Sequence, residues 1–166
     1  MKKAHKDHTK LRGMFRLQIE EDGAIKGDSG WHENLITNAG FLNIVNQMGT
    51  GLTGSKLSYA ALGTGGVPGA TDTSQTGEVV TNGSGSVVRA ALTAATSASS
   101  KTLHNTATFS SANSFITATA NISNVGLWQT SGPITSSGSL CQGNTYTSSA
   151  LATNQNVNLT YDLIFS

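Results

Sequence analysis

The chain has 166 residues, a formal net charge of +1 and only 11% charged residues, so it has no overall field that would draw it to nucleic acid or to a membrane surface. Its single cysteine excludes an intrachain disulfide and a metal site built on thiolates. No apolar run approaches the roughly 20 residues of a membrane-spanning helix. No hydrophobic segment follows the first lysines either, so a secretory signal is not expected.

The basic residues are concentrated at the start of the chain. Six of the ten lysines and arginines lie in the first 16 residues, namely Lys2, Lys3, Lys6, Lys10, Arg12 and Arg16. Residues 1–12 are therefore predicted to form an extended basic arm, followed by one domain over residues 13–166. The body after Glu33 has few ionisable side chains, which favours a structural or binding protein over an enzyme.

The arm has two candidate partners. Lysine-rich arms can contact the phosphates of nucleic acid, but this one lacks the aromatic residues that stack on bases, so nucleic acid is not the expected partner. An acidic patch on a neighbouring protein subunit fits at least as well, with docking through Lys2, Lys3, Lys6, Lys10 and Arg12. The interpretation without a partner is a tail surrounded by solvent.

The domain opens with a predicted hairpin. Residues 12–20 alternate as a strand, with Phe15, Leu17 and Ile19 on one face. An Asp-Gly pair at residues 22–23 supports the positive φ angles of a tight turn. A second strand is expected over residues 24–36, interrupted near residues 27–30.

One short helix is predicted over about residues 39–48. Asn38 is its expected N-cap, Gly40 keeps its first turn slim against the sheet, and Gly49 ends it. Four apolar residues recur at helical spacing: Phe41, Ile44, Val45 and Met48. This helix is expected to plug one end of a sheet.

The rest of the chain reads as strands between turn-rich segments. Expected strands cover residues 57–62, 87–95, 102–109, 115–122, 125–129, 140–146 and 156–166. The last shows the clearest alternation, because Val157, Leu159, Tyr161, Leu163 and Phe165 share one face. The predicted fold is an all-β antiparallel sandwich, jelly-roll-like, with one short helix.

No catalytic residue and no cofactor is predicted. The Gly63-x-Gly65 segment follows a strand but lacks the helix and lysine of a phosphate loop, so close backbone approach explains its glycines better. Asp72 is expected in a turn that bonds its own backbone. Glu78 is expected to pair with Arg89, which leaves no carboxylate pair for glycoside hydrolysis.

No physiological metal site is predicted either. His5 and His8 lie on a flexible arm, where two imidazoles do not make a preorganised site. His32 and His104 are expected to be surface or hydrogen-bonded histidines. Cys141 is expected to be a small core or edge residue.

Two aromatic residues are candidates for an interface with a partner. Trp128 follows Leu127 at the edge of a loop, and Tyr146 lies in a weakly patterned strand. Most other aromatic residues fall on apparent core faces. Both residues are therefore possible interface anchors.

Several short motifs resemble a loose family of small structural proteins of tailed bacteriophages. They are Asn34-Leu-Ile-Thr-Asn-Ala-Gly-Phe41, Tyr59-Ala-Ala-Leu-Gly-Thr-Gly65, Asp72-Thr73 with Glu78-Val79, Asn124-Val-Gly-Leu127 and Leu159-Thr-Tyr-Asp-Leu163. The resemblance covers about residues 30–166. It departs from the family at Asn124, where an acid is common, at Trp128, where Phe is common, and in the arginine usually close behind "EV", a role open to Arg89.

The resemblance implies a β-sandwich virion component without catalytic activity, assembled in the host cytoplasm and associated with tail, fibre or head. The expected partners are other virion proteins and further copies of the chain, with no membrane. A second hypothesis is a receptor- or carbohydrate-binding module of a phage tail, which would need exposed aromatic residues such as Trp128 and Tyr146. A third, an enzyme acting on polysaccharide, is disfavoured by the missing carboxylates.

Overall fold

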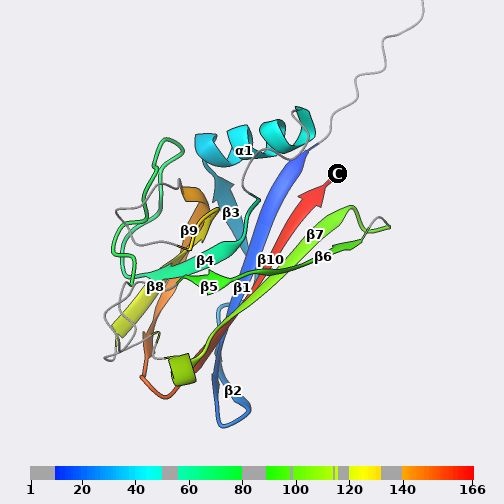
Figure 1. The fold of residues 1–166 in the computed structure, drawn as a ribbon. Coiled ribbons are helices and arrows are strands. Elements are labelled where there is room, and N and C mark those ends of the chain that lie inside the picture. The colour runs from blue at the N-terminus through cyan, green and yellow to red at the C-terminus, as the bar shows by residue number, and fades with distance from the viewer. Residues whose placement is uncertain are drawn as a thin grey trace, which may run out of the picture.

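The computed structural model describes residues 10–49, 56–79, 89–97, 99–113, 115, 120–131 and 140–166. Within them lie ten strands, one α-helix and one 3-10 turn (Figure 1). In chain order the elements are β1 (Leu11–Glu21), β2 (Ala24–Asp28), β3 (His32–Ile36), α1 (Asn38–Gly49), β4 (Tyr59–Gly63), β5 (Ala90–Ala91), β6 (Thr93–Ser97), β7 (Thr102–Phe109), η1 (Ser111–Asn113), β8 (Ala120–Trp128), β9 (Leu140–Leu151) and β10 (Asn156–Phe165).

The strands form one antiparallel sheet in the order β5-β4-β8-β9-β3-β1-β10-β7-β6, with β2 added to β1. Its two edges are linked because β5 and β6 are consecutive, separated by Leu92 alone. This stretch pairs with β4 through Tyr59 and Ala91, and with β7 through Thr93 and Thr106. The sheet is therefore nearly closed into a barrel, and the prediction of an all-β antiparallel fold with one short helix is confirmed.

The core lies inside this barrel, where the two longest alternating patterns meet. Phe15 pairs with Tyr161 and Leu17 with Leu159 across β1 and β10, and all four side chains are at most 4% exposed. Their neighbours along each strand are less buried, as the period of two requires. Burial of these large apolar side chains supplies the main stabilisation of the fold.

The predicted first hairpin is confirmed. Asp22 and Gly23 have φ angles of 51° and 76°, and Glu21 pairs directly with Ala24, so the loop is a two-residue turn with both central residues at positive φ. The expected interruption is also present, because β2 ends at Asp28 and β3 begins at His32.

The strand predicted from residue 12 begins at Leu11. Lys10 exchanges backbone hydrogen bonds with Ser166, and Arg12 forms an ion pair with Glu33. Residues 10–12 of the predicted arm therefore belong to the barrel, at the end where β1 begins. Residues 1–9, with Lys2, Lys3 and Lys6, lie outside the described residues.

The helix covers Asn38–Gly49, close to its prediction, but its N-cap is Thr37 rather than Asn38. The Thr37 hydroxyl accepts a hydrogen bond from the Gly40 N–H at 3.1 Å, which is the cap geometry. The same hydroxyl donates to the Leu140 carbonyl at 2.6 Å, and Thr37 is fully buried. The threonine therefore fixes the start of α1 to β9, a tertiary contact that the local sequence does not reveal.

Gly40 is required by the close approach of α1 to β9, as predicted. A Cβ at this position would lie 2.0 Å from the Cys141 carbonyl oxygen, whereas a Cβ at Gly49 in the same helix would meet nothing within 4 Å. We expect Gly40→Ala to lower the free energy of unfolding by about 1–3 kcal/mol, because backbone must move. Urea denaturation should show this loss with Gly49→Ala near wild type; equal effects at both positions would contradict it.

The glycines of Gly63-x-Gly65 also serve close packing, as predicted. A Cβ on Gly63 would lie 2.1 Å from Asn124 Oδ1, and one on Gly65 would lie 2.3 Å from the Thr76 carbonyl oxygen. They allow the segment after β4 to fold back over the outer face of β4 and β8. There it contributes an isolated bridge between Gly63 and Glu78.

Candidate interaction surface

Helix α1 lies at one end of the barrel (Figure 1). It has an exposed apolar face. Four large apolar side chains are largely in solvent: Phe41 at 48% exposure, Leu42 at 60%, Val45 at 61% and Met48 at 80%. The helix contains no charged residue. We call these four residues the α1 face.

The α1 face is exposed because the opposite side of the helix, which carries small side chains, packs against the sheet. Only Gly40 and Asn43 of the helix are buried, while Ile44 is partly buried against the core. The helix therefore covers the end of the barrel as expected, but most of the residues that predicted it point away. Exposed apolar clusters of this kind mark interaction sites in soluble proteins.

A cavity of about 320 Å³ lies beside the α1 face, between the helix and the ends of β7 and β10. Its apolar lining comes from Ile44, Met48, Leu57, Ala94, Leu103, Leu163 and Phe165. Lys56 also lines it and is exposed. Asn105 lines it while only 1% exposed, and the Asn105 Nδ2 has no hydrogen-bond partner among the described residues.

The predicted pair of Glu78 and Arg89 is confirmed and fully buried. Arg89 Nε donates to Glu78 Oε1 at 2.7 Å and Arg89 Nη2 donates to Glu78 Oε2 at 3.1 Å, with both side chains 1% exposed. The guanidinium carbon lies 3.5 Å from the ring centroid of Trp128. This cluster neutralises its own charges and is part of the structure.

The prediction that Trp128 anchors an interface with a partner is wrong, because the residue is only 2% exposed. Leu127 points into the barrel core, so Trp128 points to the outer face of β8. There Gln75 and Arg89 cover it, and the indole N–H donates to Gln75 Oε1 at 3.3 Å. Trp128 therefore lies outside the barrel core, but a loop of the same chain covers it where a partner was expected.

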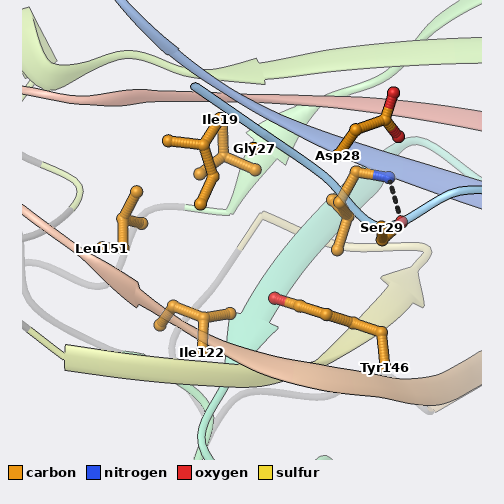
Figure 2. Close-up of a pocket in the computed structure, with 9 residues that line it drawn as sticks. Ile19, Gly27, Asp28, Ser29, Ile122, Tyr146 and Leu151 are labelled. Atoms are coloured by element: carbon orange, nitrogen blue, oxygen red, sulfur yellow. Dashed lines mark hydrogen bonds between the residues drawn. The ribbon is translucent and has the colours of Figure 1, made fainter. Parts of the chain in front are cut away.

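Tyr146 is likewise not an exposed anchor. It packs on the core against Phe15 with ring centroids 6.3 Å apart, and burial raises its pKa above the usual range. Figure 2 shows its hydroxyl directed into a small cavity between β1, β2 and β8–β10, near Ile122 and Leu151. That cavity measures about 20 Å³, room for a water molecule and not for a substrate.

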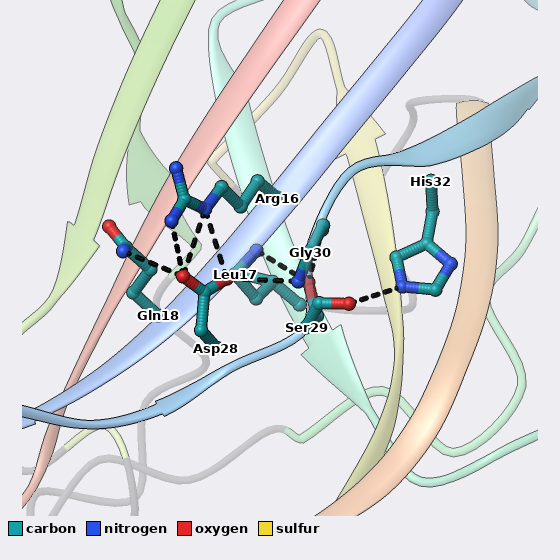
Figure 3. A network of polar contacts seen from close by, with 7 residues as sticks. All are labelled: Arg16, Leu17, Gln18, Asp28, Ser29, Gly30 and His32. Atoms are coloured by element: carbon teal, nitrogen blue, oxygen red, sulfur yellow. Dashed lines mark hydrogen bonds and ion pairs between the residues drawn. The ribbon is translucent and has the colours of Figure 1, made fainter.

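Asp28 gathers the hydrogen bonds that hold β2 against β1 (Figure 3). Its carboxylate accepts from Arg16 Nε at 2.9 Å, from Gln18 Nε2 at 3.1 Å and from the Gly30 N–H at 2.9 Å. The Arg16 guanidinium, followed by the Gly30 N–H, holds the pKa of Asp28 well below its usual range. With all its partners inside the chain, this carboxylate serves as a staple for the hairpin.

We expect Asp28→Asn to lower the free energy of unfolding by about 1 kcal/mol or less at pH 6, since the pair is partly exposed. Because the folded protein keeps Asp28 ionised, its contribution is present above the pKa of the unfolded chain, about 3.9, and is lost as the pH falls below it. Urea denaturation from pH 6 to pH 2 should show the variant converging on wild type. A difference in stability between variant and wild type that stays constant with pH would contradict this. Asp22→Asn in the same hairpin is the control for the loss of one carboxylate.

The described histidines and the cysteine fulfil the structural roles predicted for them. The His32 Nε2 lies 2.7 Å from the Ser29 carbonyl oxygen, and His104 Nδ1 lies 2.6 Å from Asp162 Oδ1. Cys141 is buried, and burial raises the pKa of its thiol to about 11, so the thiolate is scarce at neutral pH. His5 and His8 lie outside the described residues.

Asp72 bonds a nearby backbone, as predicted, by accepting from the Gly69 N–H at 2.7 Å. Among the residues that the structure describes, no group of three or more histidine, cysteine, aspartate or glutamate side chains is placed to hold a metal ion. In the same residues no helix is long and apolar enough to cross a membrane. The α1 face and its cavity were missed in the sequence, where the adjacent apolar pair Phe41-Leu42 was the available signal.

Comparison with protein-family models, with curated proteins and with solved structures finds no match to this chain. The surface around α1 therefore has to be interpreted from its own chemistry.

Proposed function

We propose that the chain is a non-enzymatic structural protein of a tailed-bacteriophage virion. It would be an exterior component associated with the head or the tail, such as a decoration, cement, fibre or collar protein. Its partners would be capsid or tail subunits and further copies of itself, assembled in the host cytoplasm. The N-terminal arm would dock it, through Lys2, Lys3, Lys6, Lys10 and Arg12.

The observation that carries this proposal is the α1 face, an uncharged apolar surface on a barrel whose buried charges are paired internally. Such a surface suits protein contact. The motifs that resemble phage structural proteins support the same conclusion, because Gly40, Gly63 and Gly65 each allow close backbone packing and none supplies a reactive group.

The sugar-binding alternative has less support. Stacking against a sugar face requires an exposed aromatic ring, and neither residue predicted for this role offers one: Trp128 is 2% exposed, and Tyr146 is partly buried against the core. Trp31, at 47% exposure, is the described aromatic ring outside the α1 face that remains available.

Two tagged chains, full-length and lacking residues 2–9, test the proposal when each is produced in the host during infection. The deletion leaves β1 intact, since that strand begins at Leu11. We expect gradient-purified particles to contain the full-length chain in a fixed number of copies and to lack the truncated chain. Particles without either chain would overturn the virion assignment, and equal incorporation of both would overturn docking through Lys2, Lys3 and Lys6 of the arm.

A further inference from the structure

The two ends of the barrel differ in shape. Helix α1 covers one end, and the hairpin of β1 and β2 projects from the opposite end (Figure 1). Strand β1 joins them, because Leu11 pairs with Phe165 near α1 and Glu21 pairs with Ala24 in the hairpin. Its 11 residues span roughly 35 Å. One end therefore has an exposed apolar surface with a cavity, and the other is a narrow projection.

The tip of the hairpin carries an exposed apolar side chain. Ile25 is 52% exposed, and Ala24 and Lys26 beside it are exposed as well. In the part of the chain that the structure describes, β2 pairs with β1 alone, so its other edge has free backbone groups. An isoleucine on a narrow two-stranded tip is small enough to enter a cavity of about 320 Å³.

The two ends also carry opposite charge among the described residues. Near α1, beyond the paired Arg12 and Glu33, lie Lys10, Lys56 and Lys101 against Asp72. At the hairpin, beyond the paired Arg16 and Asp28, lie Glu20, Glu21 and Asp22 against Lys26. A hairpin end brought to an α1 end would therefore be attracted, whereas two like ends would repel.

We propose that copies of this chain associate head to tail, with the β1–β2 hairpin tip of one copy docked on the α1 face and its cavity in the next. Ile25 would contact Val45 and Met48, while Glu21 and Asp22 would approach Lys56 and Lys101. The partner of each copy is thus a second copy of the chain. This inference rests on the proposed function, because a virion is the setting in which many copies meet. Such a contact joins two different surfaces, so it forms a ring if the rotation closes and an open filament if it does not.

Complementation between two variants tests this arrangement. Ile25→Asn damages only the hairpin surface, and Val45→Ser with Met48→Ser damages only the α1 face. These residues are exposed, so each variant should retain wild-type thermal unfolding. Trp31→Ser, at an exposed position between the two ends, is the matched control.

By sedimentation velocity, we expect wild type and Trp31→Ser to associate as concentration rises, and less so at high salt. Each damaged variant alone should associate about tenfold more weakly. An equimolar mixture of the two should form a complex of two chains at wild-type affinity, because one intact hairpin meets one intact α1 face.

Other outcomes would overturn the proposal. Wild type that stays monomeric at all concentrations would refute self-association, and Ile25→Asn that dimerises with wild-type affinity would refute the hairpin contact and indicate pairing of two α1 faces. A mixture that does not associate would also refute the head-to-tail contact. The particle assay reports independently: incorporation without self-association leaves the virion proposal standing, and self-association without incorporation leaves this one standing.

Discussion

Replacing Arg89 with Met is expected to lower the free energy of unfolding by about 3–5 kcal/mol, the largest effect we predict for a single substitution. The substitution leaves the Glu78 carboxylate, 1% exposed, without its two guanidinium hydrogen bonds. It also removes the contact with the Trp128 ring and the hydrogen bond from Arg89 Nη1 to the Thr130 carbonyl oxygen at 3.0 Å. Chemical denaturation at neutral pH measures the loss.

A double substitution separates the ion pair from the space it fills. Glu78→Leu with Arg89→Met removes both charges and fills their space with apolar side chains. The double variant should therefore be more stable than Arg89→Met alone. Arg12→Met is the matched control, because the Arg12–Glu33 pair is 55% and 72% exposed and exposed pairs contribute about 1 kcal/mol or less. Similar losses at Arg12 and Arg89 would contradict the argument.

The barrel strands were predictable because their signal is local. Alternation with a period of two placed Phe15 and Leu17 on one face of β1 and Leu159 and Tyr161 on one face of β10, and all four are buried. The Asp-Gly turn was predictable for the same reason, since positive φ is a property of those residue types. The closure through Leu92 was not, because which strands pair depends on contacts far apart in the sequence.

The outer layer on β4 and β8 shows why the interface residues were misplaced. Alternation correctly takes Trp128 out of the barrel core, but a period of two does not say whether a partner or the chain itself covers the other face. Here the segment that includes Gln75 and Glu78 folds back across it. Such coverage depends on how a glycine-rich loop folds, which residue periodicity does not encode.

The α1 face shows the opposite limit. Apolar residues at helical spacing correctly predicted a helix at the end of the sheet, yet Phe41, Val45 and Met48 are exposed. The helix contacts β9 through Gly40, whose lack of a side chain lets the backbones meet. A glycine at the contact leaves the apolar stripe beside it in solvent, so the same pattern that predicted the helix also marks an interaction surface.

Asn124 stands where an acid is common in the motif that the chain resembles, and it leads to the second large expected effect. Asn124 is fully buried, accepts from Gln75 Nε2 at 2.6 Å and donates through Nδ2 to the Thr76 carbonyl oxygen at 3.1 Å and the Gly66 carbonyl oxygen at 3.3 Å. Asn124→Asp would place a carboxylate against two carbonyl oxygens. We expect it to lower the free energy of unfolding by about 2–4 kcal/mol at pH 7.

The loss at Asn124→Asp should depend on pH with a definite sign. Burial against carbonyl oxygens raises the pKa of the introduced acid above the value of about 3.9 in the unfolded chain, so the folded variant binds a proton that the unfolded chain releases. The variant should therefore gain stability relative to wild type as the pH falls from 7 toward 4, where a protonated carboxyl can donate to the Thr76 carbonyl oxygen. Asn121→Asp, at an exposed position in the same strand, should show neither the loss nor the pH dependence. A variant as stable as wild type at pH 7 would contradict this prediction. It would mean that the loop over β8 rearranges to accept an acid at this position.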